Sequence, residues 1–515
     1  LQYPYQRPGV KYSKKKDRKR TVHQWYKLLE EAARDALTLP SSSFHIDHFA
    51  PLHLFRSAPL RDGMWDMPKG TWFKVDVPPA ELEDSKERRR EALPSFDAEC
   101  IHTIGYYLLM RWMGAREENV FWIHAANPAL RSYEYCGEDG MELPPSCDWD
   151  IYNNLHDGRL SEDRAVGQLF MMGRGFDLKG NDIANKYSVG ERVEIRNTTA
   201  FTFELMPAVV HEIIGRRVVL KYSGSDIIDR SLIKMDVRMD MDDEWIFPVG
   251  FASSRGLPLV ANAFYCKHSE AVAKEKTSEP QYKRLRHMDA DEKKVFSGIR
   301  NWSGDRRKWL TNARWKDNMM CEMHDRLDDN QSILKAARVI RVLKDGFLFI
   351  GPDGVDIEQD AVVLPKTSRT LFPVGYAKAH GITLDGPKES DEDVFDWNSY
   401  LKRKKYPKAP NHFFEETILA NQFEVGMKLE AIDRTEKKLS PATVKAIKGR
   451  LILVSFDGWD ESYDHLYDFR SEEIFPYGWG EMVGYPLEAP GQTIDVKEEI
   501  IELDEDSNDK RSDEW

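Results

Sequence analysis

A six-residue landmark that occurs three times along the chain most constrains its fold. The landmark consists of an aliphatic residue, an aromatic residue, Pro, any residue, Gly and an aromatic residue, and its copies begin at Ile246, Leu371 and Ile474. Ten residues after the start of each copy lies a Gly, and three residues further on lies a Leu. A weaker copy with the same spacing begins at Leu130. Because self-similarity at a regular spacing identifies a repeat architecture, we expect four tandem units.

Short β-rich segments precede each landmark. Residues 423–430 alternate apolar and polar side chains, which is typical of a half-buried strand, and weaker counterparts lie at 69–73, 188–194 and 318–322. Further β-rich runs follow glycine-containing turns at Gly215, Gly346 and Gly449. These patterns predict a mainly β fold in which a small, strongly bent sheet, a barrel, is repeated four times.

Helical signals lie between the predicted barrels. Residues 21–37 carry apolar side chains at helical spacing after Thr21, a plausible N-cap, and similar segments open at 148, 308 and 396. We therefore expect an N-terminal arm of helix and extended chain to precede each barrel, with the aromatic residues of the arm packed against the barrel. The predicted divisions are a basic arm at 1–20, repeats at 21–147, 148–262, 263–387 (with a linker) and 388–490, and an acidic tail at 491–515.

The best-preserved unit has a family likeness. The strand at 425–434, the turn at 456–464 and the landmark at 474–479 closely resemble the malignant-brain-tumour (MBT) repeat. The resemblance extends over about residues 20–490 as four repeats, and it is thinnest in the first. It implies four tandem Tudor-like five-stranded β-barrels, each with an N-terminal arm, as in the MBT transcriptional repressors of nematodes and other animals. It also implies recognition of methylated lysine on histone tails.

The fourth repeat contains side chains suited to that ligand. A methylated ammonium keeps its charge but loses hydrogen-bond donors, so aromatic faces bind it well and a carboxylate can accept a remaining N–H. Phe456, Trp459 and Tyr463 match the three cage aromatics of the family, and Asp433 matches its cage acid. Glu436 occupies a position that is often Asn in the family, a departure that bears on methylation-state preference. The alternative is that Phe456 and Trp459 are only barrel core.

The other repeats have lost most of these side chains. In the second repeat, the positions of Asp433, Phe456 and Trp459 are occupied by Asn197, Tyr222 and Ser225. In the third repeat, the same positions are occupied by Asp325, Pro352 and Val355. In the first repeat, Val77 occupies the position of the acid. Loss of two aromatic faces removes most of the attraction for a cation. We therefore expect repeats one to three to be structural or to contact other partners.

Charge is distributed unevenly along the chain. The whole chain carries a net charge of −13, residues 1–20 hold eight basic residues and one acid, and residues 494–515 hold ten acids and three bases. An acidic body suits a basic partner such as a histone tail, and the basic arm suits weak nucleic-acid contact or nuclear import. Ile500, Ile501 and Leu503, followed by acids, resemble a SUMO-interacting motif. For both termini the alternative is a solvated segment.

Several functional classes lack support in the sequence. Nucleotide-binding, hydrolase and metalloprotease motifs are absent, and nothing suggests a cofactor. The five cysteines form no Cys-x-x-Cys motif, which excludes a zinc ribbon. Their small, odd number fits a reducing compartment. His45, His48 and His53 lie close together in a Pro-containing stretch that favours a loop over a metal site. The longest apolar run, residues 104–110, is far shorter than the ~20 residues of a membrane span.

These observations predict a non-enzymatic nuclear protein that reads methylated lysine, most plausibly on histone H3, through the fourth repeat and thereby supports transcriptional repression. The alternative is a scaffold whose repeats hold the protein subunits of a repressor complex without reading the mark.

Overall fold

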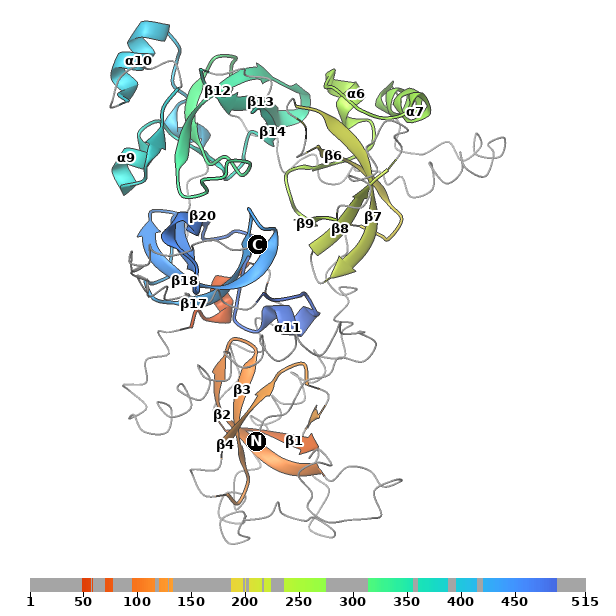
Figure 1. The fold of residues 1–515 in the computed structure, drawn as a ribbon, viewed down its shortest axis with the longest axis vertical. Coiled ribbons are helices and arrows are strands. Elements are labelled where there is room, and N and C mark those ends of the chain that lie inside the picture. The colour runs from red at the N-terminus through yellow and green to blue at the C-terminus, as the bar shows by residue number, and fades with distance from the viewer. Residues whose placement is uncertain are drawn as a thin grey trace, which may run out of the picture.

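Four small β-sheets follow one another along the chain in the computed structural model shown in Figure 1. The structure describes residues 49–56, 58, 70–76, 95–115, 120–127, 129–132, 187–197, 200, 203–214, 217–223, 236–274, 314–354, 360–387, 395–414 and 420–488. The two charged termini lie outside this part of the chain, as do Val77, Ser225, Val355 and the helices expected near 21–37, 148 and 308. Within the described residues, no helix has the length and apolar character needed to cross a membrane.

Each sheet contains five antiparallel strands in the same spatial order, with the fourth strand at one edge and the fifth pairing with the first at the other. The first sheet comprises β1 (Thr71–Asp76), β2 (Ser95–Ile104), β3 (Tyr107–Trp112), β4 (Val120–His124) and β5 (Leu130–Ser132). The second comprises β6 (Arg192–Arg196), β7 (Leu205–Ile214), β8 (Arg217–Tyr222), β9 (Val237–Asp240) and β10 (Ile246–Phe247). The third comprises β11 (Met320–Met323), β12 (Leu334–Val342), β13 (Phe347–Pro352), β14 (Val362–Pro365) and β15 (Leu371–Phe372), with β16 (Leu384–Asp385) added in parallel to β12. The fourth comprises β17 (Lys428–Asp433), β18 (Lys438–Lys448), β19 (Leu451–Phe456), β20 (His465–Asp468) and β21 (Ile474–Phe475).

The strand registers of the four sheets coincide. The second strand of each sheet contains a fully buried Ala at the same register. On one side this Ala pairs with the first strand, and on the other side it pairs with the last residue of the third strand. The four residues are Ala98, Ala208, Ala337 and Ala442. Two residues after each Ala the register shifts by a bulge. A bulge increases local twist and bends a strand, so the shared bulge helps to curl each sheet in the same way. The predicted mainly β fold of four repeated bent sheets is therefore confirmed.

The landmark of the sequence closes each sheet. Its first residue pairs with the first strand at the equivalent position in all four repeats; the four residues are Leu130, Ile246, Leu371 and Ile474. In repeats two to four a short helix follows, namely α6 (Phe251–Arg255), α9 (Tyr376–His380) and α11 (Trp479–Val483). The glycines on either side of each helix have positive φ, which explains why Gly recurs there. The Leu after each helix forms a parallel bridge to the second strand.

A buried glutamate on the first strand binds the start of each of these helices. Glu430 accepts hydrogen bonds of 2.8 Å from the backbone N–H groups of Gly478 and Gly480, and Glu194 and Glu322 do the same in their repeats. A carboxylate satisfies the free N–H groups of a helix N-terminus. In the first repeat the equivalent residue is Lys74, and there the landmark has also lost its Pro and Gly.

Two short segments with the pattern Ala-Pro-x-His-x-Phe pack on neighbouring repeats. Residues 409–414 contain the 3-10 helix η7 (Asn411–Phe413) and pair with Met320 at the start of β11, so the segment before repeat four covers repeat three. Residues 50–55 contain η2 (Leu52–Leu54), and Ala50 donates a backbone hydrogen bond of 3.0 Å to Lys428. The segment before repeat one thus covers repeat four.

The repeats share hydrophobic cores. One core joins the first and fourth sheets, where the backbone N–H of Tyr106 donates to the Tyr477 carbonyl at 2.9 Å. Other cores join the second with the third sheet and the third with the fourth. The other helices in the part of the chain that the structure describes are α7 (Ala263–Lys274), α10 (Trp397–Lys404), η6 (Lys344–Gly346) and η8 (Glu461–Tyr463). The expected helix at 396 is α10, with Asp396 as its N-cap.

Candidate functional site

The loop between β19 and β20 exposes two aromatic rings. Trp459 and Tyr463 are 43% and 36% exposed, and they are the only large aromatic side chains with this degree of exposure among the described residues. Their ring centroids lie 5.3 Å apart with planes inclined at 57°. This exposure shows that the two rings lie at the surface and are not part of the buried barrel core.

Local hydrogen bonds give this loop its shape. The backbone N–H of Trp459 donates to the Phe456 carbonyl at 3.0 Å, and Gly458 between them has a φ of +79°, which glycine tolerates best. The Asp460 side chain then caps η8 by accepting a hydrogen bond from the Ser462 backbone at 2.9 Å. The three-residue helix places Tyr463 back beside Trp459.

Two ion pairs hold the ends of the loop on the barrel. Lys428 on β17 lies 3.0 Å from Asp457, at the start of the loop, and Lys445 on β18 lies 2.7 Å from Asp464, at its end. The hydrogen bond to Asp464 also raises the pKa of Lys445, which keeps that side chain charged. Pairs at both ends favour one position of the loop in the absence of a ligand.

Asp433, the last residue of β17, presents a partly satisfied carboxylate. Its Oδ1 accepts hydrogen bonds from the backbone N–H groups of Thr435 at 2.8 Å and Glu436 at 3.1 Å. In the described part of the chain, no side chain donates to Oδ2 and no Lys or Arg nitrogen lies within 4.0 Å of the group. Lys438, opposite Asp433 across the hairpin, instead lies 3.7 Å from Glu436 and 3.5 Å from Glu488. Burial raises the pKa of Asp433, which two backbone hydrogen bonds only partly offset.

His465 connects the acid to the aromatic wall. Its Nε2 lies 3.7 Å from Asp433 Oδ1, and its ring meets Phe456 edge to face with centroids 5.1 Å apart. Burial, reinforced by Arg434, lowers the pKa of His465 to about 3, so the ring is neutral. Tyr467 Oη donates to the Ile432 carbonyl and lies 3.1 Å from Nδ1, which assigns the ring proton to Nδ1. His465 therefore offers Asp433 no charge and no proton.

The five predicted site residues thus fall into three groups. Trp459 and Tyr463 form an open pair, whereas Asp433 and Phe456 are buried and both contact His465. Glu436 is exposed, contributes its backbone N–H to Asp433, and directs its side chain toward Lys438. An open aromatic pair and a carboxylate without a cation are the features needed to hold an alkylated ammonium ion.

The third repeat keeps the acid, Asp325, but pairs it with a lysine of the same repeat. Lys335 Nζ lies 3.2 Å from Asp325 Oδ2 and also pairs with Asp328, which follows Asp325 by three residues as Glu436 follows Asp433. Lys335 pairs with Met323 across the hairpin, and the residue at this register in repeat four is Ser440. Repeat three therefore neutralises its acid, whereas repeat four leaves the acid unpaired.

In the first two repeats the described residues at the positions of Asp433 and Phe456 contact other parts of their own barrel. Burial at the Phe456 position does not distinguish the repeats, because Phe456 itself is also buried. In repeat two, Tyr222 is buried and donates to the Arg196 carbonyl at 3.1 Å, while Asn197 donates to Glu204 at 2.7 Å. In repeat one, Trp112 ends β3 at the Phe456 position, is buried, and packs on Phe121 with centroids 4.5 Å apart. The equivalent positions that the structure describes in these repeats expose no aromatic pair.

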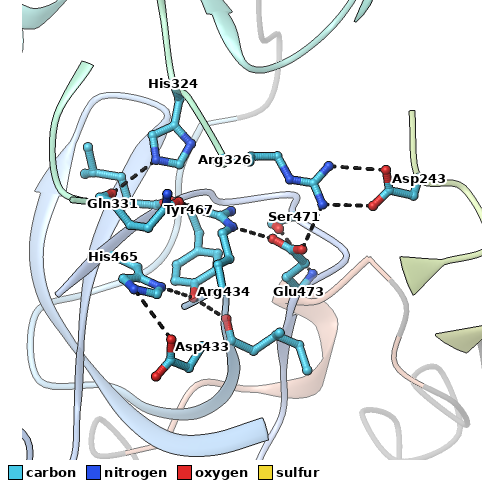
Figure 2. Close-up of polar contacts among 12 residues, drawn as sticks. Asp243, His324, Arg326, Gln331, Asp433, Arg434, His465, Tyr467, Ser471 and Glu473 are labelled. Carbon is cyan, nitrogen blue, oxygen red and sulfur yellow. Dashed lines mark hydrogen bonds and ion pairs between the residues drawn. The ribbon is translucent and has the colours of Figure 1, made fainter. Parts of the chain in front are cut away.

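A charged network ties the fourth repeat to the second and third directly behind Asp433 (Figure 2). Arg434 Nε donates to Glu473 at 2.7 Å and its Nη1 donates to Gln331 of repeat three at 3.2 Å. Arg326, at the equivalent position in repeat three, bridges Asp243 of repeat two at 2.8 Å and Glu473 at 3.1 Å. Burial alone would raise the pKa of Glu473, but the arginines outweigh it and hold the pKa well below its usual range. The end of β17, which carries Asp433, is thus held in place by the hydrogen bonds of the next residue, Arg434.

The sequence did not predict the roles of His465 and Ser440. His465 lies two residues beyond Tyr463 and carries no motif of its own, and Ser440 matters only because a lysine stands at that register in repeat three. Both depend on side chains that meet across hairpins of different length.

Comparisons with known proteins agree with this architecture. Segments 191–265, 319–391 and 427–494 match the family model of the mbt repeat. The chain is 31% identical over 417 residues to protein lin-61 of Caenorhabditis elegans, which covers 75% of this chain and 65% of that protein. It is 28% identical to MBT domain-containing protein 1 of Xenopus laevis (86% of this chain, 65% of that protein) and 28% identical to Polycomb protein Sfmbt of Drosophila melanogaster (88% and 36%). The chain thus spans less than two thirds of the length of these curated relatives.

A solved structure matches most of the chain. The four MBT repeats of Drosophila melanogaster Sfmbt, crystallised in complex with the peptide RHR(me)KVLR, superpose with a TM-score of 0.67 at 24% identity, over 88% of this chain and 98% of that one. At this identity the match establishes the fold. Three segments that match the mbt repeat and a fourth sheet in the same register lead to one conclusion: the chain contains MBT repeats and has the fold of a four-repeat MBT array.

Proposed function

We propose that this chain is a non-enzymatic chromatin reader that binds methylated lysine through Asp433, Phe456, Trp459 and Tyr463 of repeat four. The observation that carries the proposal is the open Trp459–Tyr463 pair on the same barrel as a carboxylate that no cation occupies. Support also comes from Sfmbt, whose four repeats were crystallised with a peptide containing a methylated lysine.

The chemistry of the site fits a methylated ammonium better than a free one. Each aromatic face contributes about 0.5–2 kcal/mol to a desolvated cation, and a hydrogen bond to a charged group contributes about 1.5–3 kcal/mol. Asp433 Oδ2 is the atom that would accept an N–H of mono- or dimethyl-lysine. The Glu436 side chain adds negative charge at the rim, and only the backbone N–H of Glu436 contacts the carboxylate of Asp433. Binding of this kind to a single peptide is expected in the micromolar range.

The cellular role follows from the ligand and from the named relatives. A net charge of −13 favours a basic partner, and we assign a histone tail, with histone H3 as the first candidate. The likeness to Polycomb protein Sfmbt supports a nuclear role in transcriptional repression. Contacts of residues 500–503 with SUMO and of residues 1–20 with nucleic acid remain separate predictions, because both segments lie outside the described residues.

Fluorescence anisotropy with labelled histone H3 peptides tests the proposal. Unmodified, mono-, di- and trimethylated peptides are titrated with the full chain, with Trp459→Ala, and with Val425→Ala as the control, since Val425 is an exposed apolar residue of the same repeat. We expect methylation-dependent binding that weakens at least tenfold in Trp459→Ala and is unchanged in Val425→Ala. Equal binding by the wild-type chain and Trp459→Ala would refute the assignment of Trp459 to the methyl-lysine site.

A second candidate function is a scaffold for repressor-complex proteins. It is favoured by the second and third repeats, where Asn197 replaces the acid and donates to Glu204, and where Asp325 is paired with Lys335. Co-purification of the same partners with wild-type chain and Trp459→Ala, without measurable peptide affinity for either, would select this function over reading.

A further inference from the structure

The end of α10 and the segment after it form a concentrated basic surface. Residues 402–408 contain five basic residues and no acid, in a chain whose net charge is −13. Four of these side chains, Lys402, Arg403, Lys405 and Lys408, are exposed, and we call them the basic ridge. Figure 1 places α10 at the outer edge of the third repeat, on the side away from the second repeat.

The helix is fixed so that the ridge faces outward. Trp397 Nε1 donates to Glu322 at 2.8 Å, and Tyr400 Oη donates to Asp353 at 2.6 Å, so one face of α10 is bound to repeat three. Lys402 and Arg403 lie on the other face. Beyond the helix, the Pro407 carbonyl accepts a hydrogen bond of 2.9 Å from the Met320 backbone, which fixes the chain next to Lys408.

The ridge side chains are not neutralised from within the molecule. Among the described residues, no carboxylate oxygen lies within 4.0 Å of Lys402, Arg403, Lys405 or Lys408, and Arg403 has only a ring contact, 5.4 Å above Tyr400. By contrast, Lys428, Lys445 and the arginines behind Asp433 are all paired with acids. A helix C-terminus favours nearby cations, but that effect falls off within the last turn. Lys405 caps the helix and Lys408 lies beyond it, so the dipole does not account for the whole cluster.

The shape of the ridge distinguishes between two uses of a basic run. Such runs serve either as nuclear import signals or as contacts to nucleic acid. Here residues 402–404 form the last turn of α10, and Lys408 pairs with Met320 of repeat three, so both ends of the run are held on that repeat and the run presents a fixed charged surface. None of its members is an exposed aromatic residue on which a base could stack, which favours contacts to phosphates.

We propose that the basic ridge binds the phosphate backbone of duplex DNA. This contact is independent of sequence and independent of methyl-lysine binding by repeat four. In chromatin it would hold the protein to the DNA on which a histone tail lies, so that a weak peptide contact and a weak DNA contact act together through effective concentration.

Salt-dependent binding to a fluorescent 25-base-pair duplex tests the ridge. Each lost phosphate contact lowers the slope of log K against log salt by about 0.9. We expect the triple variant Lys402→Ala, Arg403→Ala, Lys405→Ala of the full chain to lose at least tenfold in affinity at low salt and about two to three units of slope. Alanine is a strong helix former, so α10 is retained. Unchanged thermal unfolding and unchanged affinity for a methylated peptide verify that the fold and repeat four are intact.

Two matched variants make the result specific. The first removes three exposed cations elsewhere, Lys267, Arg341 and Lys344, and is expected to bind the duplex like wild type. The second replaces Lys14, Lys15 and Lys16 by Ala, because residues 1–20 are also basic. The proposal is overturned if the ridge variant keeps the wild-type affinity and slope, if the first control loses as much, or if only the second loses affinity. Binding of poly-glutamate but not of the duplex would also overturn it and identify an acidic protein surface as the partner.

Discussion

Replacement of Ser440 by Lys should give the acid of the fourth repeat an internal ion pair like the one that Lys335 forms with Asp325 in the third repeat. Lys335 and Ser440 occupy the same register on the second strand, and Lys335 Nζ lies 3.2 Å from the acid of its repeat. A lysine at 440 should therefore reach Asp433 and occupy the position proposed for the ligand ammonium. The substitution tests whether an unpaired Asp433 is needed for binding, and it leaves every aromatic residue of the site in place.

The expected size of the effect follows from this geometry. Two unit charges about 4 Å apart attract by about 4 kcal/mol at an effective dielectric constant of 20. Fixing the lysine side chain and removing part of its hydration costs about 2 kcal/mol. The net gain of about 2 kcal/mol must be given up when a peptide enters, so the Kd for a dimethylated peptide should rise roughly 30-fold. The same pair should stabilise the free protein, because Asp433 is a buried acid without a cation partner.

Fluorescence anisotropy and thermal unfolding together measure both consequences. Ser440→Met is the control, since it adds a side chain of similar length without charge. We expect Ser440→Lys to weaken binding and raise the Tm relative to Ser440→Met. If the lysine variant binds the methylated peptide as tightly as the methionine variant, then Asp433 does not contact the ligand ammonium and the role assigned to it is refuted.

Three further outcomes are expected. Asp433→Asn should weaken binding of mono- and dimethylated peptides about tenfold, and that of a trimethylated peptide less, because only the lower states have an N–H to donate. His465 should contribute a loss of stability on acidification: burial gives it a pKa of about 3 when folded against about 6.5 unfolded, so its contribution is complete above pH 6.5 and falls by about 1.4 kcal/mol per pH unit between pH 6.5 and pH 3. Gly105→Ala should lower the Tm by several degrees, because φ is +53° there and a Cβ would lie 2.1 Å from the Tyr477 carbonyl oxygen.

Each of these has its own control. Peptide affinity that falls equally for all methylation states in Asp433→Asn would point to loss of fold rather than of a hydrogen bond. Thermal melts at pH 7 and pH 5 should show a smaller difference for His465→Gln than for wild type, and an equal difference would contradict the assignment of a neutral buried ring. Gly256→Ala has a similar positive φ of +63° but open space around the new Cβ, so it should cost less than Gly105→Ala.

Much of the architecture follows from the sequence because its signals are local. The landmark at Ile246, Leu371 and Ile474 marks the closing strand of each sheet, and even the weak copy at Leu130 lies at the equivalent register. Asp396 identified the start of α10, whereas the alternation at 423–430 located β17 only approximately, because the strand begins at Lys428 and Val425 lies exposed in the turn before it. In each case neighbouring residues determine the conformation.

Long-range contacts were not predictable in the same way. The glutamates that bind the short helices, such as Glu430, act on residues about fifty positions away and carry no local pattern. The packing of Phe55 on Phe423 of the fourth repeat joins the two ends of the array, and no periodicity in the sequence indicates it. The state of each acid is likewise set by a partner across a hairpin, as Lys335 shows for Asp325. Candidate residues could be named from the sequence, whereas their availability for a ligand could not.

The most direct test of the central claim is NMR of a histone H3 peptide whose dimethyl-lysine carries carbon-13 methyl groups. Contact of the methyl groups with the ring faces of Trp459 and Tyr463 should move the methyl resonance upfield when wild-type protein is added, and Trp459→Ala should abolish most of that movement. An equal shift with both proteins, or no upfield shift with wild type at saturation, would show that the methyl groups do not lie against these rings.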